Sequence, residues 1–360
     1  MPLPLYLLTT LLSLLLTALL ARHAARLGLV DQPNARSNHS QPTPRGGGTA
    51  IVLATLIATT ASLLLDSAPD DPLASQPIGA ALVLGLPIAA IGLIDDLKGV
   101  PARWRFTTQT LSVMILLLWL APLPALLLAP GVALPAQLLA LGLWFFGVAW
   151  INTFNFMDGI DGLAASQALF MLVSATLLVL IGTPNALTHP LLTLTLAIAC
   201  ATLGFLILNW SPGRIFMGDV GSTWLAFMIF ALAILTVRAG WMNFGSWLIL
   251  GAVFVTDTTL TLLVRIKNGE RWYSAHRSHA YQRRVAQLMQ RGLSRTSAHR
   301  RVCLGIAGIN LIALMPLAWA AQHWPHYNMV IVILAYLPLM IAGLYLGAGR
   351  ADSVECAHGD

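Results

Sequence analysis

Charge is scarce in this chain. Asp, Glu, Lys and Arg together make up 9% of its 360 residues, whereas 57% are hydrophobic and the mean hydropathy is +0.77. Soluble globular domains carry about 25% charged residues, so this composition excludes a water-soluble protein. We expect an all-α polytopic membrane protein, because helices satisfy their own backbone hydrogen bonds in lipid.

Cysteine, sequence repeats and a leading positive charge are also lacking. Cys200, Cys303 and Cys356 show no disulfide or metal-ligand spacing. No internal repeat is visible, so the inverted repeats of many secondary transporters are missing. No positive charge precedes the first apolar run, whereas Arg22 and Arg26 follow it. This order predicts a retained first span with its N-terminus outside, not a secretory signal.

Long apolar runs, by contrast, are abundant. A helix crosses a hydrocarbon layer about 30 Å thick with roughly 20 apolar residues. Eleven such runs are present. They cover residues 3–21, 47–65, 77–94, 108–128, 133–151, 163–181, 189–208, 222–238, 244–263, 303–321 and 328–346. We therefore predict one transmembrane catalytic domain over residues 1–350, followed by a cytoplasmic tail at 351–360.

Basic residues fall in alternate gaps between these runs. Gaps 22–46, 95–107, 209–221 and 264–302 carry nearly all of them, and Arg238 is the exception. The positive-inside rule places these gaps, gap 151–162 and the C-terminus in the cytoplasm of a bacterial inner membrane. Topology and lipid headgroups then explain the net charge of +6, and no nucleic acid partner is needed.

Acidic residues number only 14, and six aspartates lie at predicted cytoplasmic ends of spans. A carboxylate at the membrane boundary carries a desolvation cost that an ordinary loop position avoids. The clustering therefore indicates function. The six are Asp95, Asp96, Asp158, Asp161, Asp219 and Asp257.

The first motif is Asp95-Asp96-Leu97-Lys98. It can be a solvated helix end. It can also be a metal or phosphate site, because adjacent carboxylates repel and a divalent cation or the Lys98 ammonium relieves that repulsion. Whether one aspartate acts as a base or a nucleophile stays open.

The second motif places Asn152, Asn155, Asp158 and Asp161 within ten residues, with a glycine after each aspartate. The Asp-Gly pairs predict a tight turn, and the side chains offer amide and carboxylate groups to a ligand. A plain polar turn between two spans is the alternative. Four such side chains are more than a turn requires, which favours function.

The third motif, residues 216–222, sets Asp219 between two glycines at the start of a predicted span. A helix N-terminus favours an anion such as phosphate, although Asp219 can simply cap the helix. The glycines indicate close approach of backbone or ligand. Gly46, Gly47 and Gly48 also open a span, but the P-loop order of residues is absent there.

The long basic gap holds His276-Arg277-Ser278-His279. Neighbouring arginines favour a phosphate-facing surface over a histidine metal site, with general binding of anionic lipid as the alternative. Val285, Leu288 and Met289 then recur at helical spacing before Gly292. That spacing predicts an amphipathic helix on the inner leaflet.

In order and on one membrane face, these motifs resemble the polyprenyl-phosphate N-acetylhexosamine 1-phosphate transferases, the family of MraY, WecA and WbpL. The resemblance runs from about Arg36 to Arg284 and is closest to the WecA/WbpL branch. Eleven spans look more like WecA than ten-span MraY, whereas His276-Arg277-Ser278-His279 departs from the histidine strings of both and looks like WbpL. It implies that Asp219 binds Mg²⁺, for which Mn²⁺ can substitute, and that Asp95, Asp96 and His279 are catalytic. It implies substrate contacts for Arg36, Lys98, Asn152, Asn155, Asp158, Asp161, Asn209, Phe216, His276 and Arg277.

The implied reaction moves a sugar 1-phosphate from a UDP-N-acetyl sugar, with a hexosamine or its 6-deoxy form, to undecaprenyl phosphate. It releases UMP and starts O-antigen or related glycan synthesis. Membrane lipids are further partners, and a homodimer is left open. The competing interpretations are a transporter for anionic solutes, a transferase of the CDP-alcohol type and a lipid-binding scaffold. Mid-membrane acids and the Asp-Gly-x-x-Ala-Arg pattern, which would favour the first two, are missing.

Overall fold

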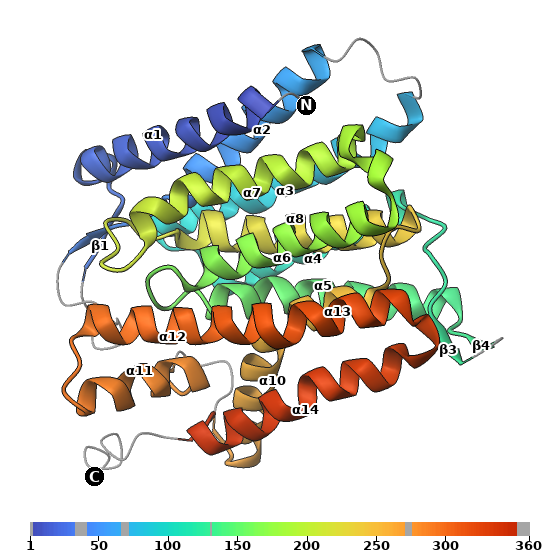
Figure 1. Ribbon diagram of the computed structural model, residues 1–360. Coiled ribbons are helices and arrows are strands. Elements are labelled where there is room, and N and C mark those ends of the chain that lie inside the picture. The colour runs from blue at the N-terminus through green and yellow to red at the C-terminus, as the bar shows by residue number, and fades with distance from the viewer. Residues whose placement is uncertain (1–2, 33–41, 66–71, 130–131, 271–275, 351–360) are drawn as a thin grey trace.

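The computed structural model describes residues 3–32, 42–65, 72–129, 132–270 and 276–350, and these ranges are helical almost throughout. Arg36 and the predicted tail at 351–360 lie outside them. The longer helices run roughly alongside one another (Figure 1). Their bounds are α1 Leu3–Leu27, α2 Gly48–Leu65, α3 Pro72–Lys98, α4 Ala102–Trp119, α5 Ala136–Phe156, α6 Leu163–Gly182, α7 Pro190–Asn209, α8 Gly218–Arg238, α9 Phe244–Leu250, α10 Ala252–Lys267, α11 Ala280–Gln290, α12 Arg295–Ile309, α13 Met315–His323 and α14 Asn328–Leu346.

Short elements complete the chain. A π-helical turn, Asn310–Leu314, joins α12 to α13, and 3-10 turns occupy Pro184–Thr188 and Pro325–Tyr327. Two antiparallel strand pairs are also present. They are β1 Val30–Asp31 with β2 Thr43–Pro44, and β3 Leu127–Ala129 with β4 Val132–Ala133. They lie at opposite ends of the helical bundle (Figure 1). The expectation of an all-helical polytopic membrane protein is confirmed.

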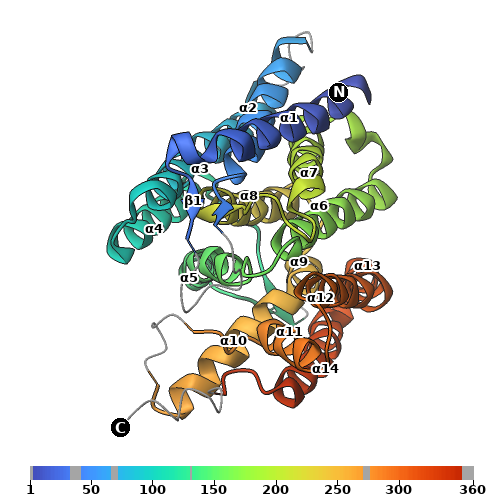
Figure 2. The same cartoon turned by 90° about the vertical axis from the view of Figure 1, so that its left-hand side faces the viewer.

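Helix α8 lies at the centre of the bundle (Figure 2). It packs against α2, α3, α5 and α6, and most of its side chains are buried. Helices α1 and α14 are instead lined with exposed leucine, isoleucine and valine, as lipid-facing helices are. The core therefore centres on α8, and the N-terminus of α8 carries the third motif.

Eight helices in the described ranges are long and apolar enough to cross a membrane, or nine if α9 and α10 form one bent span. The apolar part of α2, Gly48–Ser62, is shorter. Helix α4 begins at Ala102, six residues before the predicted start at 108, because Pro101 precedes it and fixes the entry of the chain. Arg103 and Arg105 consequently lie within a helix, whereas the sequence had placed them in a loop.

The span predicted at 244–263 is broken. Helices α9 and α10 meet at Gly251 with a bend of 72°, and α10 leaves the bundle at an angle (Figure 2). A broken helix frees backbone carbonyls that must be satisfied inside a membrane. Gln167 Nε2 donates to the Leu250 carbonyl at 2.9 Å, and Asn310 Nδ2 donates to Gln167 Oε1 at 2.7 Å. Buried polar side chains from α6 and the π turn thus support the bend.

The amphipathic helix predicted near Val285 is confirmed as α11, and Gly292 follows it with φ of +88°. Its apolar face is covered differently from the prediction. Val285 and Leu288 are buried, and α11 packs against α12 and α14. Protein therefore covers this face where the sequence predicted the inner leaflet.

Candidate active site

Three of the sequence motifs meet in one pocket. Asp96 lies near the end of α3, Asn155 in the last turn of α5, Asn209 at the end of α7 and Asp219 at the start of α8. A pocket of about 270 Å³ lies between these helix ends. Seven predicted residues line it, namely Asp96, Asn155, Asp158, Asp161, Asn209, Phe216 and Asp219.

Asp96 holds the start of α8. Its Oδ1 accepts the Asp219 N–H at 3.0 Å and its Oδ2 accepts the Val220 N–H at 3.2 Å, and the residue is only 2% exposed. Gly218 has φ of +75°, and a Cβ there would lie 2.4 Å from Asp96 Oδ2. Only glycine fits this turn, so the glycine before Asp219 serves the close approach of Asp96.

The glycines at the start of α2 also serve packing. Gly47 N–H donates to the Phe216 carbonyl at 2.9 Å, and Gly48 N–H donates to the Met217 carbonyl at 2.8 Å. A Cβ on Gly48 would lie 2.1 Å from the Gly221 Cα. These glycines thus bring α2 against the third motif, where they fix the backbone around Asp219.

Arg105 joins the first motif to the third. Its Nη1 donates to Asp95 Oδ2 at 2.8 Å and to Asp219 Oδ2 at 2.5 Å. Asn155 Nδ2 donates to Asp219 Oδ1 at 3.0 Å and to Ser222 Oγ at 2.9 Å. Two carboxylates therefore share one guanidinium, and an amide orients the second carboxylate from the opposite oxygen.

Asn209 ties the second motif to the third. Its Oδ1 accepts the Gly162 N–H at 3.0 Å and its Nδ2 donates to the Ile215 carbonyl at 2.9 Å. The residue is 3% exposed. Both ends of the amide are engaged, so Asn209 sets the spacing of the two loops around the pocket.

The pocket is electronegative. Five aspartates line it, against two arginines, Arg45 and Arg295. Burial raises the pKa of Asp158 well above its usual range, and the carboxylates of Asp219, Asp96 and Asp161 raise it further. Such a pocket can admit an anionic ligand only together with added positive charge, either a cation or a proton held on a carboxyl such as that of Asp158.

The pKa of Asp161 is shifted in the opposite direction from that of Asp158. Burial raises the pKa of Asp161, but the adjacent His299 imidazole and the Gly213 N–H outweigh that effect and lower the pKa below its usual value. His299 Nδ1 lies 3.2 Å from Asp161 Oδ2, and an Arg295 nitrogen lies 4.0 Å from Oδ1. Helix α12 therefore holds Asp161 as a carboxylate.

The remaining predicted residues lie outside this lining. Asn152 Nδ2 donates to Gln109 Oε1 at 2.9 Å, which ties α5 to α4. Lys98 is exposed at the end of α3. Asp95 reaches the pocket through Arg105, as described above.

The histidine segment, residues 276–279, directly precedes α11, whose first turn reaches the pocket through Gln282. His279 is 3% exposed, and its Nδ1 lies 3.2 Å from Asp257 Oδ1. His276 is half-buried with its ring 4.9 Å from that of His279. Burial, His279 and Arg265 lower the pKa of His276 to about 4. Arg277, also half-buried, lies between the two histidines in the chain.

Sequence reasoning missed several charged partners. The sequence predicts Arg105 in the gap 95–107, and its one signal there is its position ten residues after Asp95. Arg295 and His299 carried no signal, because more than a hundred residues separate them from Asp161. Arg45 directly precedes the three glycines, but no sequence pattern indicates its contact with the backbone carbonyl of Asp96.

The arrangement can gather a cation and phosphates. Asp95 and Asp219 already surround a single positive charge, and a small cation of the Mg²⁺ type needs only one or two carboxylates besides substrate phosphates and water. Among the described residues, no three His, Cys, Asp or Glu side chains converge as a metal site. The donor set therefore fits a cation that shares its ligands with substrate, not a closed structural metal centre.

Known proteins are similar to this chain in sequence. Residues 78–237 match the family described as Glycosyl transferase family 4. A probable undecaprenyl-phosphate N-acetylglucosaminyl 1-phosphate transferase of Bacillus subtilis is 31% identical over 83% of this chain and 79% of its own length. A decaprenyl-phosphate N-acetylglucosaminephosphotransferase of Mycobacterium leprae is 30% identical over 80% and 76%. A phospho-N-acetylmuramoyl-pentapeptide-transferase of Moorella thermoacetica is 32% identical over 61% and 68%. The chain therefore belongs to the polyprenyl-phosphate N-acetylhexosamine 1-phosphate transferases of glycosyl transferase family 4.

Proposed function

We propose that this protein transfers an N-acetylhexosamine 1-phosphate, or its 6-deoxy form, from a UDP-sugar to undecaprenyl phosphate and releases UMP. The names of the relatives support this reaction. The observation that carries the proposal is the aspartate-lined pocket at the ends of α3, α5, α7 and α8. In this pocket Asp219 lies at the N-terminus of a buried helix, where phosphate groups are favoured.

Mg²⁺ is the proposed cofactor, with Mn²⁺ as a substitute. Asp219, with Asp95 beside it, would hold the ion. Both substrates are anionic and the pocket lining is acidic, so charge neutralisation is what the ion supplies when bound. Arg105 provides part of the same positive charge from the protein itself.

Direct attack is the proposed chemistry. An oxygen of the lipid phosphate forms a bond to the β-phosphorus of the UDP-sugar, while the bond from that phosphorus to the bridging oxygen breaks. The bridging oxygen and its electron pair leave with UMP. Both carboxylate oxygens of Asp96 accept backbone N–H groups, which favours a positioning role for Asp96 over a role as nucleophile.

Arginine and aromatic side chains would orient the donor. Arg45 and Arg295 line the pocket among the aspartates and can contact phosphate oxygens. Phe216 lines it as well and offers a ring face for uracil to stack on. His276, Arg277 and His279 are proposed to approach the sugar or the pyrophosphate from the segment before α11.

The proposed topology has eleven spans, with the N-terminus outside and the pocket facing the cytoplasm of a bacterial inner membrane. Support comes from the positive charge of the gaps at the pocket end of the bundle, whose arginines include Arg45 and Arg105. The lipid-linked product would initiate O-antigen or a related cell-surface glycan. The names of the relatives favour N-acetylglucosamine as the first donor to test.

The test uses purified full-length protein in detergent micelles with undecaprenyl phosphate and Mg²⁺. UDP-N-acetylglucosamine, UDP-N-acetylgalactosamine, their 6-deoxy analogues and UDP-N-acetylmuramoyl-pentapeptide are supplied one at a time, and UMP release is followed. We expect UMP from at least one simple UDP-N-acetyl sugar and loss of that activity with EDTA. Absence of UMP with every donor would contradict the proposed reaction.

A second measurement distinguishes direct attack from a two-step reaction through a covalent phosphoryl-enzyme. Direct attack predicts that UMP appears only when the lipid acceptor is present. A stoichiometric burst of UMP without acceptor would show a covalent phosphoryl-enzyme and would overturn direct attack.

A further inference from the structure

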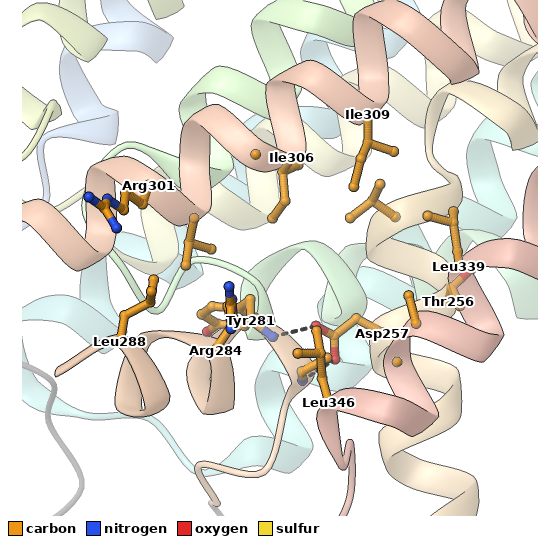
Figure 3. Close-up of a pocket in the computed structure, with 16 residues that line it drawn as sticks. Thr256, Asp257, Tyr281, Arg284, Leu288, Arg301, Ile306, Ile309, Leu339 and Leu346 are labelled. Carbon is orange, nitrogen blue, oxygen red and sulfur yellow. Dashed lines mark hydrogen bonds between the residues drawn. The ribbon is translucent and has the colours of Figure 1, made fainter. Parts of the chain in front are cut away.

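A second cavity lies on the other side of α11 from the candidate active site. It has a volume of about 470 Å³ and lies between α10, α11, α12 and α14 (Figure 3). Helix α11 separates the two cavities, since Tyr281 lines this one and its neighbour Gln282 lines the active-site pocket. We call this second cavity the lateral cleft.

The lateral cleft arises because α12 and α14 diverge. Helix α14 packs against α13 near their connection and against α10 and α11 further along. From that connection α14 slopes away from α12 toward the end of the bundle that carries α11 (Figure 1). The opening between the two helices is therefore wedge-shaped, with α10 behind it and α11 closing its wide end.

The walls of the cleft are apolar and reach the surface. Ile306 and Ile309 of α12 face Leu339 of α14 across it (Figure 3). Ile309 is 41% exposed, and Ala342 on α14 is exposed as well. Both helices belong to candidate membrane spans. An apolar opening at this depth faces the hydrocarbon of the bilayer, which selects an acyl chain over a polar solute.

Positive charge marks one end of the cleft. Arg284 reaches in from α11 and Arg301 from α12, at the end remote from Leu339 (Figure 3). Arg301 is exposed, and among the described residues it makes no ion pair. The cleft also contains Asp257, but its two oxygens accept the first N–H groups of α11 at 2.9 and 3.0 Å, which engages its charge.

We propose that the lateral cleft binds an anionic phospholipid of the cytoplasmic leaflet. One acyl chain lies between α12 and α14, and the phosphate lies beside Arg284 and Arg301. The α11 end of the cleft is also the end of the bundle with the basic gaps, where lipid headgroups are expected. An apolar wedge with two arginines at headgroup depth matches a lipid that is both anionic and acylated.

Native mass spectrometry tests the proposal by titrating dioleoyl phosphatidylglycerol, dioleoyl phosphatidylcholine and undecaprenyl phosphate onto full-length protein in detergent. We expect phosphatidylglycerol to bind more tightly than phosphatidylcholine. In an Arg284→Gln, Arg301→Gln double variant we expect about 30-fold weaker phosphatidylglycerol binding, since each arginine near a bilayer contributes about 1 kcal/mol and 1.4 kcal/mol corresponds to tenfold.

Two further variants make the result specific. Arg22→Gln with Arg291→Gln removes two exposed arginines outside the cleft and serves as the matched control, with affinity expected within about twofold of the parent protein. Ala342→Phe fills the apolar part and should also weaken binding without touching either arginine.

Equal losses in the cleft and control double variants would mean general surface electrostatics and would overturn the proposal. Arginine-dependent binding of undecaprenyl phosphate but not of phosphatidylglycerol would also overturn it, because the cleft would then serve the acceptor. Neither readout requires transferase activity, so a failure here is separate from a failure of the proposed reaction.

Discussion

Replacing Arg105 by glutamine should make the protein depend on a divalent cation for stability. In the native protein one guanidinium nitrogen lies 2.8 Å from Asp95 Oδ2 and 2.5 Å from Asp219 Oδ2. The two oxygens are therefore no further apart than the sum of these distances. Without the guanidinium they face each other as like charges.

The size of the effect follows from Coulomb's law. Two unit charges about 5 Å apart repel by about 3 kcal/mol at an effective dielectric constant of about 20. The Arg105 side chain is 34% exposed and Asp219 22%, so solvent screening reduces this to about 1–2 kcal/mol. We expect the metal-free Arg105→Gln protein to lose stability by about that amount.

Thermal unfolding in detergent, with EDTA and then with Mg²⁺, measures the effect. Mg²⁺ should raise the melting temperature of the Arg105→Gln protein by more than that of the parent, because the ion relieves the uncovered repulsion. Arg103→Gln, two residues away on the exposed face of α4, is the matched control and should respond like the parent. An equal Mg²⁺ response in the Arg105→Gln and parent proteins would refute the view that the two aspartates form one cation site.

Three further predictions concern other parts of the site. Asn155→Ala should lower kcat about 10- to 100-fold, because a hydrogen bond to a charged group is worth about 1.5–3 kcal/mol. In Asn152→Ala, kcat should stay within threefold of the parent. Equal losses of kcat in the two variants would contradict the view that Asn155 orients Asp219. Gly48→Ala should abolish folded protein in size-exclusion chromatography, because its Cβ would lie 2.1 Å from backbone of α8, whereas Gly142→Ala, with open space around it, should fold normally. The pKa of His276 lies at about 4 in the folded protein, below its usual 6.5. Between pH 6.5 and pH 4 the unfolded chain therefore binds more protons than the folded protein does. The stability of the folded protein should consequently fall as the pH drops through this range. His276→Gln should flatten this part of the melting-temperature profile, and an unchanged slope would count against a neutral His276.

Composition predicts the helices well because lipid leaves the backbone few alternatives. The predicted helix boundaries that differ from the structure are those where a local sequence feature overrides hydropathy. Pro101 starts α4 ahead of its apolar run and carries Arg105 into the helix. Gly251 breaks the ninth predicted span, and the buried Gln167 that supports the break looks like an ordinary polar residue in an apolar run.

The candidate site was partly visible in the sequence. Asp96, Asp158 and Asp219 stood out because carboxylates are rare at membrane boundaries, and the structure brings them to one pocket. Their individual tasks were hidden, because they depend on contacts across the chain. Asp96 holds the start of α8 through backbone N–H groups more than a hundred residues away. No spacing rule connects Asp161 to His299 either, since only the packing of α12 brings them together.

The fate of the β-phosphate tests the central claim most directly. UDP-N-acetylglucosamine labelled with ³²P in the β position, or the best donor from the panel, is incubated with the protein, undecaprenyl phosphate and Mg²⁺, and the label is followed into organic solvent. Transfer of sugar 1-phosphate predicts that the label enters the lipid fraction in step with UMP release. The Asp219→Asn and Asp96→Asn proteins, purified as folded monodisperse species, should no longer transfer label to the lipid. Label that leaves as UDP while only the sugar reaches the lipid would contradict the account.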